Sequence, residues 1–80
     1  MGFHTIKSVK PITNMIIEVV FNNGECKKYD IKQLIKKHRI FKDLEKEELF
    51  NKVKVDTGGY GIIWNEELDL SCEEIWNNGY

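Results

Sequence analysis

The spacing of apolar and polar residues divides this chain into short strands and short helices. Residues 15–21 are dense in β-branched side chains and predict a strand, and residues 25–30 predict the strand that returns beside it. Residues 5–10 form a shorter β-prone run before Pro11, the only proline. Because proline has no amide hydrogen to give to a ladder, we expect Pro11 to mark a strand end or a turn.

The connection between the second and third strands is predicted at residues 22–24, and the faces of the two strands indicate its type. A three-residue loop with Gly24 in the left-handed region sets Ile17 opposite Tyr29 and gathers apolar side chains on one face. A two-residue loop would instead set the apolar Tyr29 opposite Glu18. We therefore expect the three-residue loop.

Three short helices are predicted, two of them from their capping residues. Asp30 can accept hydrogen bonds from the exposed amides of a helix that begins after it. Ile40 and Phe41 are expected to anchor the connection to a second helix over residues 45–51. Farther on, a Ser-x-x-Glu capping box at residues 71–74 predicts a short terminal helix.

A second hairpin is predicted between these helices, around a glycine-rich turn at residues 57–59. Its apolar residues alternate with others along the two strands: Val53, Val55, Ile62 and Trp64. Because the glycine turn leads into a strand and not into a helix, it lacks the arrangement of a phosphate-binding loop. Asp69 is interpreted as a turn or capping acid ahead of the last helix.

Together these elements predict an α+β fold. It consists of antiparallel β-hairpins in the order β-β-β-α-α-β-β-α, with the short helices packed on one face. With 80 residues the chain is long enough for one small core, so residues 1–80 are expected to form a single domain. Because so small a core is marginally stable, a homodimer is a reasonable expectation.

Charge is dense and nearly balanced, with twelve basic and thirteen acidic residues and a net charge of −1. A free-standing nucleic-acid-binding domain usually has a basic surface and a high pI, so this balance lowers that expectation. Basic residues nevertheless gather in the segment 32–42. The candidates for phosphate contacts are Lys32, Lys36, Lys37, Arg39 and Lys42. A solvated, lysine-rich helix face explains the same pattern and is the interpretation we favour.

No set of histidines and cysteines predicts a metal centre, and no motif predicts a cofactor. His4 and His38 are far in sequence from each other and from Cys26 and Cys72, so no local group of zinc ligands exists. Acidic neighbours of Cys72 favour its neutral thiol, and both cysteines are expected to be reduced.

No catalytic residues are predicted either. Asp56 and Asp69 are the carboxylates that a small enzyme of this sequence would use for acid–base chemistry. Such chemistry needs a concave, partly dry site, for which elements this short leave little room. We therefore expect a protein that is not an enzyme.

Aromatic residues gather near the end of the sequence. Trp76 and Tyr80 are the candidates for contact with a protein partner, because large aromatic side chains are enriched at interfaces. The first residues lack the pattern of a signal peptide, and no apolar stretch is long enough to cross a membrane. A cytoplasmic location without membrane contact is therefore expected.

With these residues in view, the chain resembles the small bacterial proteins of domain-of-unknown-function family 2442. The order and spacing of short motifs along nearly the whole sequence carry the resemblance. They are Val9 and Pro11, Phe21 with Gly24, Asp30-Ile31, Phe41 with Leu44, Phe50, Val53 with Val55-Asp56, Gly58, Trp64, Asp69-Leu70 and Ile75. The chain departs from the family pattern at Asn65, where proline is frequent, and at the additional Glu66 and Glu67.

The resemblance implies a fold but no defined catalytic residues. It also implies that longer members carry a helix-turn-helix DNA-binding domain, that short members often sit beside another small protein, and that some are labelled toxin–antitoxin components. Our leading hypothesis is therefore a non-enzymatic protein-interaction module, extending to the antitoxin-like or regulatory half of a two-protein system. The alternatives are a nucleic-acid-binding module that uses residues 32–42 and a small enzyme that uses Asp56 or Asp69.

Overall fold

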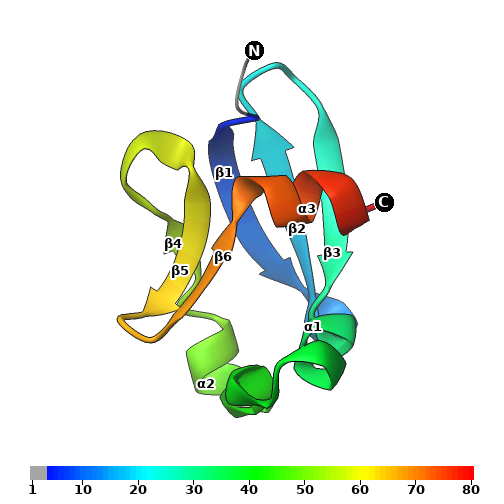
Figure 1. Cartoon of the computed structure of the whole chain (residues 1–80), viewed down its shortest axis with the longest axis vertical. Coiled ribbons are helices and arrows are strands. Elements are labelled where there is room, and N and C mark those ends of the chain that lie inside the picture. Colours follow the sequence, from blue (N-terminus) through cyan, green and yellow to red (C-terminus); the bar gives the residue numbers. More distant parts are fainter. Residues whose placement is uncertain (1–3) are drawn as a thin grey trace.

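Two three-stranded antiparallel sheets and several short helices make up the computed structural model, which describes residues 4–80 (Figure 1). The strands are β1 (Ile6–Ile12), β2 (Ile16–Phe21), β3 (Cys26–Asp30), β4 (Lys54–Val55), β5 (Gly61–Asn65) and β6 (Leu68–Ser71). The helices are α1 (Ile31–Lys37), α2 (Glu47–Phe50) and α3 (Cys72–Asn78), with 3-10 turns η1 (Thr13–Met15), η2 (Arg39–Glu45) and η3 (Thr57–Gly59). The sheets have the orders β1-β2-β3 and β4-β5-β6, and the predicted α+β class is confirmed.

The loop between β2 and β3 has the predicted register. Ile17 pairs with Tyr29, and both side chains are fully buried. Gly24 has a φ of 93°, a region that glycine enters without a Cβ clash. The three-residue loop is therefore confirmed, and it places the apolar face of both strands in the core.

The first strand is longer than predicted, because β1 runs through Pro11 as far as Ile12. Pro11 pairs with Ile17 of the central strand. The amide of Phe21 donates to the Glu25 carbonyl at 2.8 Å, so alternate β2 residues, including Ile17, direct their backbone groups toward β3. The nitrogen of Pro11 thus faces away from β2, where a missing amide hydrogen costs no ladder bond.

A sixth strand, β6, is absent from the predicted order. Leu68 and Leu70 are buried while Asp69 and Ser71 are exposed, which is the alternation of a half-buried strand. The interpretation of Asp69 as a turn or capping acid is therefore wrong. Ser71 is the N-cap of α3 as predicted, since its Oγ accepts from the Glu74 amide at 3.1 Å.

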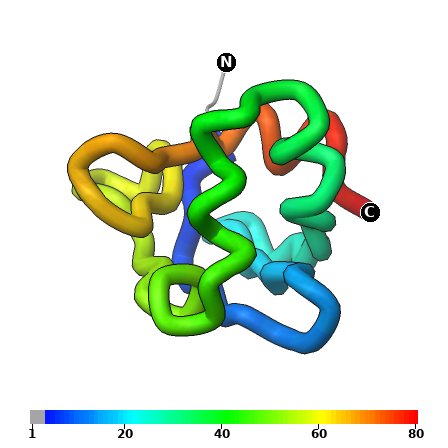
Figure 2. The backbone as a smooth tube through the Cα atoms, turned by 90° about the horizontal axis from the view of Figure 1, so that it is seen from below, coloured from blue at the N-terminus to red at the C-terminus, as the bar shows by residue number. Residues whose placement is uncertain are grey.

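The helices occupy two positions around the sheets. α3 lies across one face of the first sheet, as predicted (Figure 1). The segment from α1 to α2 instead passes beneath the sheets and closes one end of the molecule (Figure 2). The predicted second helix, residues 45–51, is shorter than expected, because α2 covers only Glu47–Phe50 and follows a 3-10 segment.

Both sheets and the helices contribute to one hydrophobic core. Its most deeply buried side chains, with no exposed surface, are Ile17, Val19, Tyr29, Ile31, Leu44, Ile62 and Ile75. The second hairpin joins this core through Trp64 and turns at Gly58 and Gly59, which both have a φ of 80°, as the glycine pattern predicts. Among residues 4–80, no helix combines the length and the apolar character that crossing a membrane requires.

Candidate functional site

Trp76, one of the two predicted partner-binding residues, is held by contacts within the protein. Its ring stacks on His4 at a centroid distance of 3.8 Å and meets Phe21 edge-on at 5.1 Å. Lys27 Nζ lies 4.7 Å from the ring centroid and donates to the Trp76 carbonyl at 2.8 Å. Trp76 therefore fastens α3 to the first sheet.

Tyr80, the other predicted residue, presents its side chain to solvent with 67% of its surface exposed. Its backbone forms two hydrogen bonds of 2.8 Å with Lys28, one in each direction. These bonds are those of a short strand pair, so Tyr80 covers the outer edge of β3. The phenol group itself remains available to a partner.

The five basic candidates of the segment 32–42 fall into two groups, according to whether their side chains contact oxygen atoms of other residues. Lys32 Nζ donates to the Asn14 carbonyl at 2.6 Å and lies 3.1 Å from an Asp30 oxygen. Lys37 Nζ lies 3.9 Å from a Glu74 oxygen. The remaining members are exposed and form no ion pair within residues 4–80: Lys36, Arg39 and Lys42.

The two aspartates considered for catalysis lie on opposite sides of β5. Asp56 follows β4 and accepts from the Thr57 amide at 2.8 Å, as a local cap does. Asp69 lies exposed on β6. The structure thus does not join them in one concave site.

Both cysteines are free, Cys26 at the surface and Cys72 in the core. Burial, together with the Glu73 carboxylate, raises the pKa of the Cys72 thiol, which keeps it neutral. Within the part of the chain that the structure describes, no group of three His, Cys, Asp or Glu side chains is placed to hold a metal ion.

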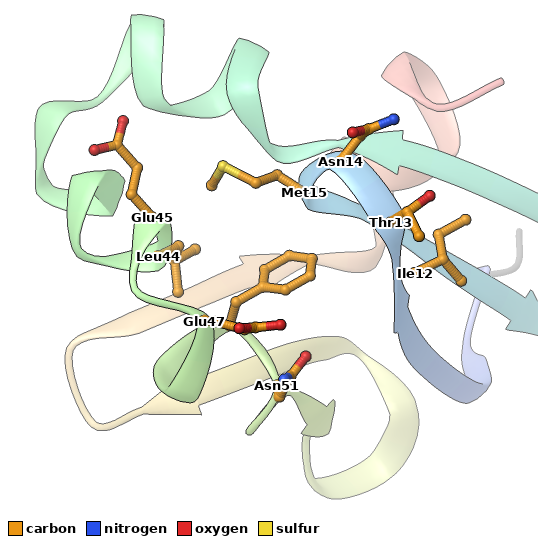
Figure 3. Close-up of a pocket in the computed structure, with 9 residues that line it drawn as sticks. Ile12, Thr13, Asn14, Met15, Leu44, Glu45, Glu47 and Asn51 are labelled. Atoms are coloured by element: carbon orange, nitrogen blue, oxygen red, sulfur yellow. The ribbon is translucent and has the colours of Figure 1, made fainter.

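A pocket of about 230 Å³ separates the η1 turn from the helical segment (Figure 3). Met15 extends across it toward Leu44. Asn14 and Met15 have φ values of 61° and 60°, which is uncommon for asparagine and rarer still for methionine. Glu45 and Glu47 line the pocket but are exposed, so neither is the shielded carboxylate that acid–base catalysis requires.

A larger groove, of about 300 Å³, lies between β6 and the segment from α1 to η2. Its apolar lining consists of Leu34, Ile40, Phe41 and Leu70, and its polar lining of His38, Asp69, Ser71 and Glu74. Phe41 is buried as expected of an anchor, but Ile40 is 58% exposed. The prediction that both residues anchor the connection is therefore wrong for Ile40.

The strand edge beside this groove has unpaired backbone groups. The Cys72 amide donates to the Tyr60 carbonyl at 2.9 Å, across the ladder that joins β6 to β5. Because backbone groups alternate between the two edges of a strand, Leu70 also faces β5, whereas Asp69 and Ser71 face away. Within residues 4–80 the outward amides of Asp69 and Ser71 have no hydrogen-bond partner.

The other strand edges are protected against pairing. β1 carries Pro11 and a register shift, the edge of β3 is covered by Tyr80, and β4 has only two residues. Among the strand edges that the structure describes, the edge of β6 combines unpaired backbone groups with an adjacent apolar groove. We call this combination, defined by Ile40, Phe41, Asp69, Leu70 and Ser71, the β6 groove.

One model of a known protein family matches this chain. The family model described as "Protein of unknown function (DUF2442)" matches residues 6–80, from β1 to the end of the sequence. The chain belongs to the DUF2442 family. No curated protein matches it, and no solved structure does. The resemblance drawn from the motifs is confirmed, and the β6 groove lies within the matched DUF2442 region.

The sequence did not identify the β6 groove of this DUF2442 chain. Trp76, Tyr80 and the five basic candidates of the segment 32–42 lie outside the groove lining. Asp69, considered for catalysis, does line the groove, but as an exposed residue of a strand. One available signal was Ile40, an apolar residue that directly follows the run Lys36 to Arg39. Its exposure depends on how η2 turns, which no local pattern determines.

Proposed function

We propose that this DUF2442 protein is a non-enzymatic protein-interaction module whose partner binds the β6 groove. The observation that carries the proposal is the exposed Ile40 beside the unpaired edge of β6. An exposed apolar side chain and an uncovered strand edge both favour association with another chain, because burial removes the apolar surface from water and pairing satisfies the edge.

The surroundings of the groove suit binding better than catalysis. Glu74, the partly buried acid of its lining, is already occupied, since it accepts from the Tyr29 hydroxyl at 2.9 Å and lies near Lys37. Asp69 is exposed to solvent, so its carboxylate lacks the partly dry surroundings that acid–base catalysis requires. As part of the proposal, the protein acts in the cytosol as the antitoxin-like or regulatory half of a two-protein system.

The proposal is tested by affinity capture from an extract of the organism that encodes the chain. Three immobilised forms are compared: the wild type, Ile40→Asp in the groove, and Lys42→Asp as a control at an exposed position of the same η2 segment. Recovered proteins are identified by mass spectrometry, and the complex is rebuilt from purified components.

We expect the wild type and Lys42→Asp to recover the same protein in stoichiometric amount and Ile40→Asp to lose it. Replacing a central apolar contact by a charge typically costs about tenfold or more in affinity. Recovery of no stoichiometric protein, or equal recovery by Ile40→Asp, would contradict the proposed function. Circular dichroism of each variant establishes that a loss of capture does not come from unfolding.

A further inference from the structure

We infer, building on the proposed function, that the partner enters the β6 groove as an extended segment that adds a strand to β6. The segment carries apolar and basic side chains in alternation. Its apolar side chains enter the groove, and its basic side chains lie beside Asp69 on the solvent side.

The backbone of β6 determines the extended form of the partner. Asp69 and Ser71 direct their amides toward the groove, and the Asp69 carbonyl points the same way. Donors and acceptors that alternate along a strand edge match another extended backbone, which is the basis of recognition by strand addition. A helix has already used its own backbone groups and would leave this edge unpaired.

The side chains of β6 determine why apolar and basic residues alternate along the partner segment. Leu70 faces the core side, where Leu34 and Phe41 line the groove, so a partner residue opposite Leu70 points at apolar surface. The partner residue opposite Asp69 points to the other side, because successive side chains of a strand alternate between faces. This period of two holds for an antiparallel or a parallel partner.

The charges around the groove favour a basic residue opposite Asp69. Glu74 is near Lys37 and bonded to Tyr29, whereas Asp69 has no ion pair within residues 4–80. The two exposed residues before β6, Glu66 and Glu67, add negative charge. His38, the remaining titratable group of the lining, is on the opposite wall, where the exposed Arg39 and Lys42 flank Ile40 and Phe41. The negative charge thus lies on the β6 side of the groove.

A second copy of the chain fits this edge less well than a basic partner. Two β6 strands paired through a twofold axis place Asp69 opposite either Ser71 or the same aspartate of the other copy. The second arrangement sets like charges directly opposite, which is destabilising, and the first gives Asp69 no opposite charge. The occupant is therefore a different protein segment with positive charge.

The experiment selects binders from a display library of random linear peptides on three forms of the protein. The wild type is compared with Ile40→Asp, which alters the apolar lining, and with Asp69→Lys, which reverses the charge at an exposed position. We expect wild-type binders to alternate apolar and basic residues. Asp69→Lys should select acidic residues at the same positions, with a change of about two- to fivefold per charged pair.

The backbone contacts are tested with the best wild-type binder, synthesised with single N-methyl groups. Methylation at alternate positions removes amide hydrogens that face β6, and methylation at the positions between them removes hydrogens that face solvent. We expect the first set to weaken binding about three- to tenfold per position and the second set to leave the affinity unchanged. The second set is the matched control, because it adds the same methyl group.

The outcomes separate the inference from the proposed function. Binders that Ile40→Asp loses, but that show no charge preference or no alternation in the methyl scan, would overturn strand addition and leave the interaction function in place. Binders that Ile40→Asp retains, or none at all, would count against both. Light scattering that reveals a dimer of the wild type, dissociated by Ile40→Asp, would assign the groove to a second copy and overturn the inference.

Discussion

Gly24 and Gly59 have similar backbone angles but different surroundings. Both have positive φ, 93° and 80°. A Cβ on Gly24 would meet nothing within 4 Å, whereas a Cβ on Gly59 would lie 2.8 Å from the Ile6 carbonyl oxygen. Gly24 is therefore needed for its conformation alone, and Gly59 also for the close approach of η3 to β1.

This difference predicts unequal costs for two substitutions to alanine. Gly24→Ala is expected to destabilise the protein by about 1 kcal/mol, the cost of a left-handed residue with a side chain. Gly59→Ala should cost about 1–3 kcal/mol more, because backbone atoms must also move. Urea unfolding of the two variants measures the difference. Equal costs would show that η3 does not pack against β1 as described.

Tyr29 links the first sheet to α3 through its hydroxyl, which donates to Glu74 at 2.9 Å. Burial, and then the Glu74 carboxylate, raise the pKa of Tyr29 above its ordinary value of 10.0. Below pH 10.0 the phenol is protonated in both the folded and unfolded chains, so its contribution to stability is constant there. Above it, the unfolded chain loses this proton first and stability falls.

Tyr29→Phe is therefore expected to change both the size and the pH profile of the stability. Near neutral pH it should cost about 0.5–1.5 kcal/mol, the usual net value of one hydrogen bond. Above pH 10.0 the difference from the wild type should shrink, since the variant has no phenol to ionise at this position. Urea unfolding at a series of pH values measures both effects. Parallel pH profiles for the two proteins would contradict the stated environment of Tyr29.

At the scale of elements, α3 is joined to the first sheet by side chains and by backbone at different points. Trp76 packs against Phe21 and His4. Tyr80 pairs with Lys28 through its backbone alone, while its ring is exposed. The two aromatic residues near the end of the sequence thus have separate roles.

Alanine substitutions are expected to separate these roles. Trp76→Ala should destabilise the protein by about 2–4 kcal/mol, somewhat below the usual cost for a fully buried tryptophan. Tyr80→Ala keeps the backbone pair and should change stability by less than about 0.5 kcal/mol. Thermal unfolding followed by circular dichroism compares the two. A large loss with Tyr80→Ala would mean that its ring is packed and not exposed.

The elements that the sequence predicts well are those governed by local rules. The loop at Gly24 follows from the pairing of faces, and the caps at Asp30 and Ser71 follow from side-chain oxygens at helix starts. β6 was missed because four residues give too short an alternation and Asp69 suits a cap equally well. β1 ends two residues later than predicted, at Ile12, because the tolerance of Pro11 depends on which edge of β1 its nitrogen faces, a property of the whole sheet.

The candidate site was less predictable than the fold. The β6 groove combines Ile40 of η2 with residues 69–71 of β6, and these segments meet only after the chain has folded. Exposure of Ile40 and the unpaired edge are both consequences of that packing. The sequence indicated an interaction module through its size and terminal aromatics, but not the surface that would carry the interaction.

At the scale of the whole molecule, the two sheets share one core and differ in how their edges end. In the first sheet, one edge strand carries Pro11, and the other edge is paired with the backbone of Tyr80. The second sheet ends at β6 with outward backbone groups beside the groove. A fold that protects some edges and leaves one open offers that edge to a partner.

The most direct test of this account is amide hydrogen exchange, measured residue by residue with and without the partner recovered by capture. In the free protein we predict fast exchange at Asp69 and Ser71 and slow exchange at Leu70 and Cys72, which face β5. In the complex, Asp69 and Ser71 should slow by about tenfold or more while Lys28, already paired with Tyr80, stays unchanged. Slow exchange at Asp69 and Ser71 in the free protein, or no change in the complex, would contradict the account.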